Sequence, residues 1–173
     1  MLERRPDLLY VVVGGERPAD SFRTTIEAMT ECHRLHDNVI LAGECSHEEI
    51  PLWLAAADLF CLATRSEGRA NVLLEALACG VPIVTTNVGG NGEIVTSPAL
   101  GVLVPPQDDH ALARAIVDAL GRSWDRDALI AHARTHSWET TAQDVFDELS
   151  HVVAERPADH ASAMDRARLA GWP

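Results

Sequence analysis

Two glutamates lie at a spacing that suits binding of a hydroxyl-rich ligand. Glu67 stands in the polar segment Thr64-Arg-Ser-Glu-Gly-Arg-Ala70, and Glu75 follows eight positions later within the apolar run of residues 71–79. From residue 70 to residue 92, Glu75 is the only charged side chain. A carboxylate is costly to bury in such surroundings unless it is hydrogen-bonded or paired. This favours a binding role for Glu75 over the alternative of a solvated residue on one exposed stripe of a helix.

The segment between these glutamates is predicted to begin a helix. A helix N-terminus presents free backbone N–H groups and the positive end of a dipole, both of which suit a phosphate group. Gly68, just before that start, lets a ligand approach the backbone closely because it has no side chain. Carboxylates accept hydrogen bonds from the hydroxyl groups of sugars. Two of them around a phosphate-binding helix start therefore predict a nucleotide-sugar site.

Alternating apolar runs and amphipathic segments predict the elements that carry this site. Strands are expected at residues 8–13, 38–42, 58–62, 82–86 and 101–104, and helices at 20–36, 47–56, 71–79, 109–121, 125–135 and 139–154. This alternation predicts an α/β fold with a doubly wound parallel sheet. In such sheets ligands bind at the carboxyl ends of the strands. The loops to consider are therefore 14–19, 43–46, 63–70, 87–92 and 105–108.

A long stretch of the chain resembles the signature of family 4 retaining glycosyltransferases. The matching residues are Ser66-Glu-Gly-Arg-Ala-Asn-Val-Leu-Leu-Glu-Ala-Leu-Ala-Cys-Gly-Val-Pro-Ile-Val-Thr-Thr86 and Val88-Gly-Gly-Asn-Gly-Glu-Ile-Val95. Gly101-Val-Leu-Val-Pro-Pro-Gln-Asp108 and the strand at 38–43 also fit. The resemblance covers residues 6–150. It implies the E-x7-E motif and the C-terminal half of a GT-B fold, in which two Rossmann-like domains occur and the C-terminal one binds most of the donor.

The resemblance also implies roles for individual positions. Glu67 would contact the hydroxyls of the donor sugar at the reacting centre, and Glu75 would hold the ribose hydroxyls. The backbone around the predicted helix start would meet the diphosphate and the sugar, at Gly68, Arg69, Ala70, Asn71 and Val72. Two glycine-containing turns would lie beside the base and line the same cleft, at Gly43 and Glu44 and at Gly14 and Gly15. No metal and no cofactor other than the donor itself is implied.

The chain departs from the family pattern at its start. Measured against the family, we expect the given residues to begin after the opening strand and helix of the C-terminal domain, which carry a basic residue for the diphosphate, and to leave out the N-terminal acceptor-binding domain. All 14 basic residues are arginines, so only arginines could supply the compensating charge. Arg65 and Arg69 flank Glu67 and Arg17 follows Gly14-Gly15, but we favour the interpretation that all three are solvated loop charges. We expect residues 1–154 to form a donor-binding domain that is incomplete at its start, and 155–173 to be a flexible or docking tail.

Composition restricts the remaining classes of function. The formal net charge of −12 argues against nucleic-acid binding, which needs basic side chains. No apolar run is long enough to span a bilayer and no signal peptide is visible, so the cytoplasm is the expected compartment. The four cysteines form no CxxC pair, which indicates reduced thiols. Cys32, His33 and His36 share one predicted helix without an evident third ligand, so a solvated surface is favoured there over a metal site.

These observations lead to one main expectation and one alternative. The chain is expected to be the donor-binding part of an enzyme that transfers a sugar from a nucleotide-diphosphate sugar to an acceptor with retention. The isolated chain is expected to be inactive without the acceptor domain, and any peripheral membrane association would be made through that domain. The alternative is a non-catalytic nucleotide-sugar-binding module or an inactive truncated fragment. If the strand order follows the family, the strand at 8–13 borders the gap left by the opening strand and exposes an unpaired apolar edge, so we expect the isolated chain to self-associate.

Overall fold

A computed structural model describes residues 5–15 and 22–154 of the chain. It divides into two compact units, residues 1–134 and 135–173. The helix that begins at Trp138, within the residues 1–154 predicted as the donor-binding domain, belongs to the second unit. The predicted tail, 155–173, lies outside the described residues, as does Arg17.

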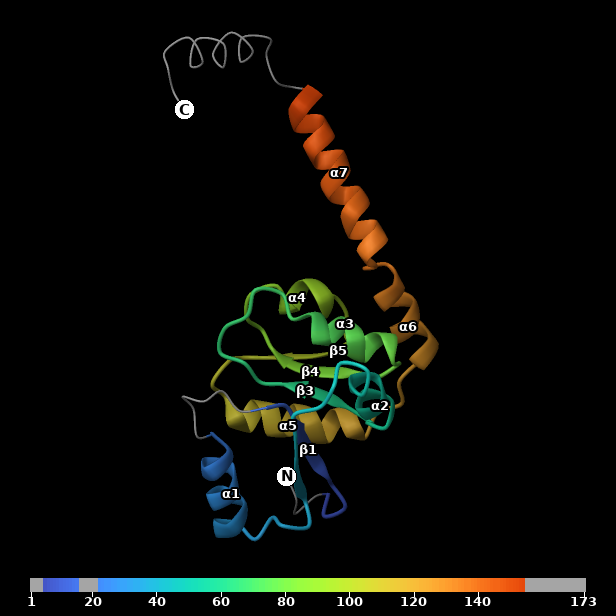
Figure 1. Cartoon of the computed structure of the whole chain (residues 1–173). Helices are drawn as coiled ribbons and strands as arrows, with labels where there is room; N and C mark the ends of the chain where they lie inside the picture. Colours follow the sequence, from blue (N-terminus) through green and yellow to red (C-terminus); the bar gives the residue numbers. More distant parts are fainter. Residues whose placement is uncertain (1–4, 16–21, 155–173) are drawn as a thin grey trace, which may run out of the picture. The chain divides into compact units, whose positions relative to one another are not determined.

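The order of the elements follows the predicted alternation of strands and helices (Figure 1). In chain order they are β1 (Tyr10–Val13), α1 (Phe22–Cys32), β2 (Val39–Gly43), α2 (Ile50–Ala55), β3 (Phe60–Leu62), α3 (Asn71–Ala78), β4 (Ile83–Thr86), α4 (Asn91–Ile94), β5 (Gly101–Val104), α5 (Asp109–Leu120), α6 (Arg126–Arg134) and α7 (Trp138–Ala154). Every predicted element is present. The short helix α4, within what was expected to be a glycine-rich loop, was not predicted.

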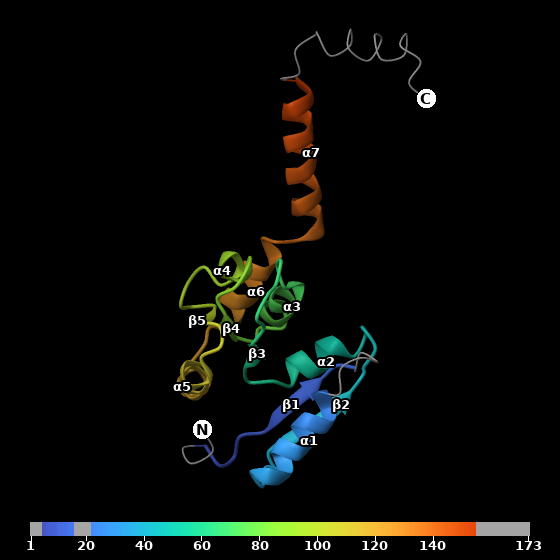
Figure 2. The same cartoon turned by 90° about the vertical axis from the view of Figure 1, so that its left-hand side faces the viewer.

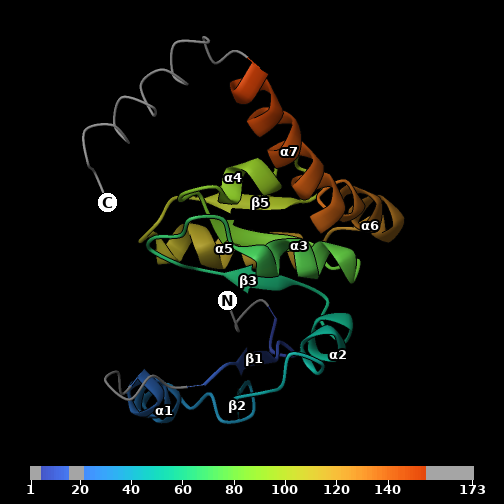
Figure 3. The same ribbon diagram turned by 45° about the horizontal axis from the view of Figure 1, so that its top comes forward.

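The five strands pair in parallel wherever they pair, as predicted, but they form two sheets rather than one. β1 pairs with β2, while β3, β4 and β5 form a three-stranded sheet with β4 in the centre. Figures 2 and 3 show the β1–β2 pair as a separate layer from the β3–β4–β5 sheet. The carboxyl ends of β3 and β4 thus stay together, as the candidate site requires.

The core of the first unit surrounds β4, whose four residues are all buried. α3 covers one face of the β3–β4–β5 sheet and α5 covers the other (Figures 1 and 2). Ile83 joins a cluster with Leu73 of α3 and Leu129 of α6, whereas its neighbour Val84 joins Ala119 of α5. Successive residues of a strand point to opposite faces, so one apolar strand anchors both layers.

The β1–β2 pair is less well covered than β4. Leu9 is 52% exposed and Tyr10 46% exposed, although parallel strands are normally buried on both faces. This agrees with the expected apolar edge at residues 8–13. Among the described residues no helix is both long and apolar enough to cross a membrane.

In the second unit, α7 is a 17-residue amphipathic helix in which no residue is buried. Its large apolar side chains fall on one face at helical spacing, and all are exposed: Trp138, Val145, Phe146, Leu149, Val152 and Val153.

Candidate functional site

Hydroxyl groups of β4 fix the carboxyl end of β3, from which the candidate site begins. The Thr85 hydroxyl donates to the Leu62 carbonyl at 2.8 Å, and the Thr86 hydroxyl donates to the Thr64 carbonyl at 2.7 Å. The second bond extends the pairing of the two strands beyond Leu62, the last residue of β3. The loop that carries Glu67 therefore leaves the sheet in a defined direction.

Asn91, the first residue of α4, joins the same network through its side chain. It is completely buried, and its Nδ2 donates to the Thr85 hydroxyl and to the Thr86 carbonyl, both at 3.2 Å. In the described part of the chain, Asn91 Oδ1 and Thr64 Oγ1 are buried without a hydrogen-bond partner. Sequence analysis missed Asn91. The available signal was an amide side chain amid glycines directly after a buried strand.

The loop after β4 lies directly against the loop after β3. The Gly90 N–H donates to the Gly68 carbonyl at 2.6 Å. Gly89 has φ +51°, and a Cβ atom there would overlap the carbonyl oxygens of Glu67 and Gly68. Only glycine satisfies both the backbone angle and this close approach.

The start of α3 carries no cap from its own sequence. Its N-cap residue is Ala70, which has no side-chain acceptor, and the first turn contains no acidic residue. The Leu73 N–H is bonded to the Ala70 carbonyl at 3.0 Å, whereas no described residue accepts from the N–H groups of Asn71 and Val72. These donors and the positive end of the helix dipole are available to an anion.

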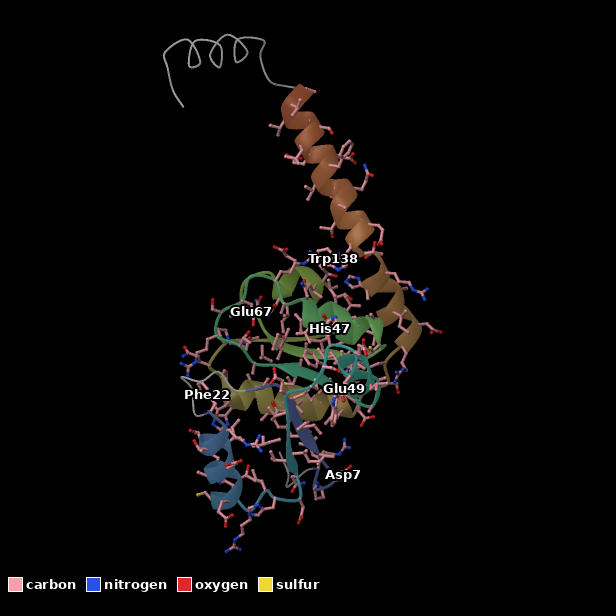
Figure 4. All side chains as sticks on the ribbon, viewed as in Figure 1. Asp7, Phe22, His47, Glu49, Glu67 and Trp138 are labelled. Carbon is pink, nitrogen blue, oxygen red and sulfur yellow. The ribbon has the colours of Figure 1, made fainter. Side chains whose placement is uncertain are left out.

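The two predicted carboxylates flank this helix start without being engaged by the described residues. Glu67, on the loop between β3 and α3 (Figure 4), and Glu75, one turn into α3, are both half-buried. Neither carboxylate has a hydrogen bond or ion pair with another described residue. Burial and the nearby Glu75 carboxylate raise the pKa of the Cys79 thiol. Arg65 and Arg69 are both exposed.

The other predicted binding residues form a second group, at the carboxyl ends of β1 and β2. The Gly14 N–H donates to the Gly43 carbonyl at 2.8 Å. Gly15 packs against Glu44, since a Cβ at Gly15 would lie 3.3 Å from the Glu44 Cβ. The structure therefore joins these four residues to one another. They lie on a different sheet from Glu67 and Glu75.

The alternative sites of the sequence analysis are not assembled. α1 ends at Cys32, so His33 and His36 lie beyond the helix rather than on one face of it. His36 instead contacts Glu31 at 3.0 Å. Across the described residues, no three histidine, cysteine or acidic side chains gather as metal ligands would. Asp108 caps α5 by accepting from the Ala111 N–H at 2.7 Å, which is a structural role.

Comparison with known proteins gives a consistent result. A family model described as "Glycosyl transferases group 1" matches residues 1–136. A D-inositol 3-phosphate glycosyltransferase of Salinispora tropica is 33% identical over 155 residues, which cover 86% of this chain and 32% of that protein. The chain therefore spans about a third of that relative's length.

Solved structures show the same similarity. The C-terminal domain of the glycosyl transferase group 1 protein LpcC from Francisella tularensis has a TM-score of 0.63 at 27% identity, covering 76% of this chain and 67% of that domain. The HepE protein of Anabaena, solved in complex with UDP, has a TM-score of 0.73 at 23% identity, covering 84% of this chain and 42% of that protein. At this identity the second similarity concerns the fold, which is Rossmann-like with parallel sheets.

Proposed function

The chain belongs to the group 1 glycosyl transferase family, and from that premise we propose that its first unit binds the nucleotide-diphosphate sugar from which a sugar is transferred with retention. The observation that carries the proposal is the uncapped start of α3 beside Glu67. The region that matches this chain is only 32% of the Salinispora protein, so most of that relative has no counterpart in these residues. We therefore assign the acceptor site to polypeptide beyond these 173 residues.

The diphosphate is the part of the donor that the α3 start suits best. The N–H groups of Asn71 and Val72 have no described acceptor, and the first turn carries no competing carboxylate. As the bond between sugar and diphosphate breaks, negative charge grows on the leaving phosphate. Backbone donors and a helix dipole already aimed at that charge stabilise the transition state without reorganising. This arrangement also fits a chain that has no lysine to supply the charge.

The carboxylates suit the two hydroxyl-bearing ends of the donor. Glu67 would accept hydrogen bonds from hydroxyls of the transferred sugar, and Glu75 from those of the ribose. Each is half-buried and unengaged by described residues, so each is free to accept such bonds. Charge-assisted hydrogen bonds of this kind are among the stronger polar contacts in proteins. The base would lie by Gly14, Gly15, Gly43 and Glu44, and no metal is required in this scheme.

Calorimetric titration with UDP-, GDP- and ADP-sugars tests the proposal. We expect one of the three to bind and Glu75→Ala to weaken both the nucleotide sugar and its nucleoside diphosphate by about tenfold, the equivalent of one lost charged hydrogen bond. Glu67→Gln should weaken the nucleotide sugar but not the nucleoside diphosphate. Asp118→Ala, which removes an exposed carboxylate of α5, is the matched control. Absence of binding by all three donors would overturn the assignment.

A further inference from the structure

We propose that Gly89 and Gly90 are positioning residues: the loop after β4 holds the Glu67–Gly68 backbone in the conformation that ligand binding requires. The inference rests on the proposed function, which it deepens. It assigns no ligand contact to either glycine. The two glycines instead set the orientation of Glu67 and of the backbone that leads into α3.

The contact between the two loops leaves no room for a side chain. Gly89 adopts φ +51°, a left-handed conformation that side chains disfavour. A Cβ at this position would overlap the Glu67 carbonyl oxygen and crowd that of Gly68. Gly90 is nearly as close, since its Cβ would lie 3.0 Å from the Gly68 carbonyl oxygen. Any residue larger than glycine at position 89 must therefore displace one of the two loops.

The hydrogen bond from Gly90 sets the direction of the next peptide group. The Gly90 N–H donates to the Gly68 carbonyl at 2.6 Å. The peptide bond is planar and trans, so the Gly68 carbonyl and the Arg69 N–H point in opposite directions. Fixing the carbonyl toward Gly90 turns the Arg69 N–H away from the loop after β4. The same bond thereby orients the backbone that enters the start of α3.

Of the two loops, the one after β4 is the better anchored. The Asn87 N–H donates to the Val104 carbonyl at 2.8 Å, and the Val88 N–H to the Thr86 carbonyl at 3.0 Å. The buried Asn91 side chain fastens the other end of this loop to Thr85 and Thr86. The loop of residues 65–69 contains neither helix nor strand. An overlap at Gly89 will therefore move Glu67 and Gly68 rather than the loop after β4.

A pair of glycine substitutions separates positioning from backbone strain. Gly89→Ala introduces both a strained φ and an overlap with the Glu67 loop. Gly80→Ala is the matched control, because Gly80 also has a positive φ (+72°) but faces only the flexible Arg126 side chain. We expect Gly89→Ala to weaken binding of the nucleotide sugar by about tenfold or more, since small misplacements of binding groups are costly. Gly80→Ala should stay within about twofold of the wild type, although both variants lower the melting temperature.

A double-mutant cycle with Glu67→Gln shows whether Gly89 acts through Glu67. If it does, the double variant binds the nucleotide sugar no more weakly than the single variant with the larger loss of affinity. The reason is that a displaced carboxylate and a missing one cost the same contact. Fully additive losses would overturn the assignment of Glu67 orientation to Gly89, and wild-type binding by Gly89→Ala would overturn the whole proposal. Gly90→Ala, whose φ is compatible with alanine, supplies a milder variant in case Gly89→Ala does not fold. The affinity of Gly90→Ala for the nucleotide sugar is expected to lie between those of the wild type and Gly89→Ala.

Amide hydrogen exchange tests the contact independently of ligand binding. The Gly90 amide should be protected in the wild type and in Gly80→Ala, and unprotected in Gly89→Ala. If the wild type binds no nucleotide while this pattern holds, the proposed function fails but the contact stands. If the Gly90 amide is unprotected in the wild type, the positioning proposal itself is wrong.

Discussion

At the residue scale, the clearest effect of burial on chemistry is at Cys61 in β3. Burial raises the pKa of the Cys61 thiol to about 11, from an ordinary value of 9.0. Folding therefore favours the protonated thiol. The contribution of this thiol to the free energy of unfolding is fully present below pH 9 and is lost as the pH rises toward 11. We expect urea denaturation to show a loss of up to about 2 kcal/mol across this range. Cys61→Ala should flatten the dependence, though not fully, because burial also raises the pKa of Tyr10.

Asn91 is the second residue whose environment makes a definite prediction. Its amide links α4 to Thr85 and Thr86 from a fully buried position. Asn91→Ala removes these bonds and should lower the free energy of unfolding by about 2 kcal/mol. Denaturant titration measures the change. Asn87→Ala, an exposed neighbour, should have little effect; an equal loss in both variants would contradict the network.

At the element scale, α3 and α5 begin in opposite ways. α5 is capped by the Asp108 carboxylate, whereas the N-cap of α3 is Ala70. Installing a cap by Ala70→Ser should stabilise the free protein by about 1 kcal/mol. The same hydroxyl would compete for the N–H groups proposed for the diphosphate, so nucleotide affinity should fall. Thermal melting and calorimetry measure the two effects, and unchanged affinity together with raised stability would argue against a ligand at this helix start.

The start of α5 provides the converse test. Asp108→Ala should cost about 1 kcal/mol of stability because the Ala111 N–H loses its acceptor. Asp108→Asn should retain most of it, since an amide oxygen also caps. Asp109→Ala removes the same charge from the first turn without removing the cap, and should cost less. Melting temperatures of the three variants decide between a capping role and a simple charge effect.

At the scale of the whole molecule, the poorly covered β1–β2 pair favours self-association. Leu9 and Tyr10 expose apolar surface beside an edge of β1 that pairs with no strand in the described part of the chain, so another chain can pair there. The net charge of −12 opposes association by repulsion, so we expect the mass seen by light scattering to rise with both protein and salt concentration. Leu9→Lys should reduce it.

Two further variants localise the association. Phe22→Lys and Phe146→Lys place the same charge on exposed apolar positions of α1 and α7. If either reduces the mass more than Leu9→Lys does, the associating surface is not the β1 edge. A mass that stays monomeric at every concentration and salt level would show that this edge does not recruit a second chain.

The sequence by itself determined the features that depend on neighbouring residues. The apolar runs predicted all five strands, and the amphipathic segments predicted every helix except α4. Each depends on interactions within a few positions of the chain, which local patterns encode directly. The motif around Glu67 and Glu75 was likewise visible, because its residues lie within one loop and one helix.

Only the tertiary structure decided how separate segments meet. The division into two sheets depends on which strand edges pair, and no local pattern encodes that choice. The contact of Gly89 with the Glu67 carbonyl and the burial of Asn91 join loops that are distant in sequence. Gly89 and Asn91 looked like ordinary loop residues because their roles arise from shape and hydrogen bonding across the carboxyl ends of β3 and β4. Those constraints exist only once the two strands lie side by side.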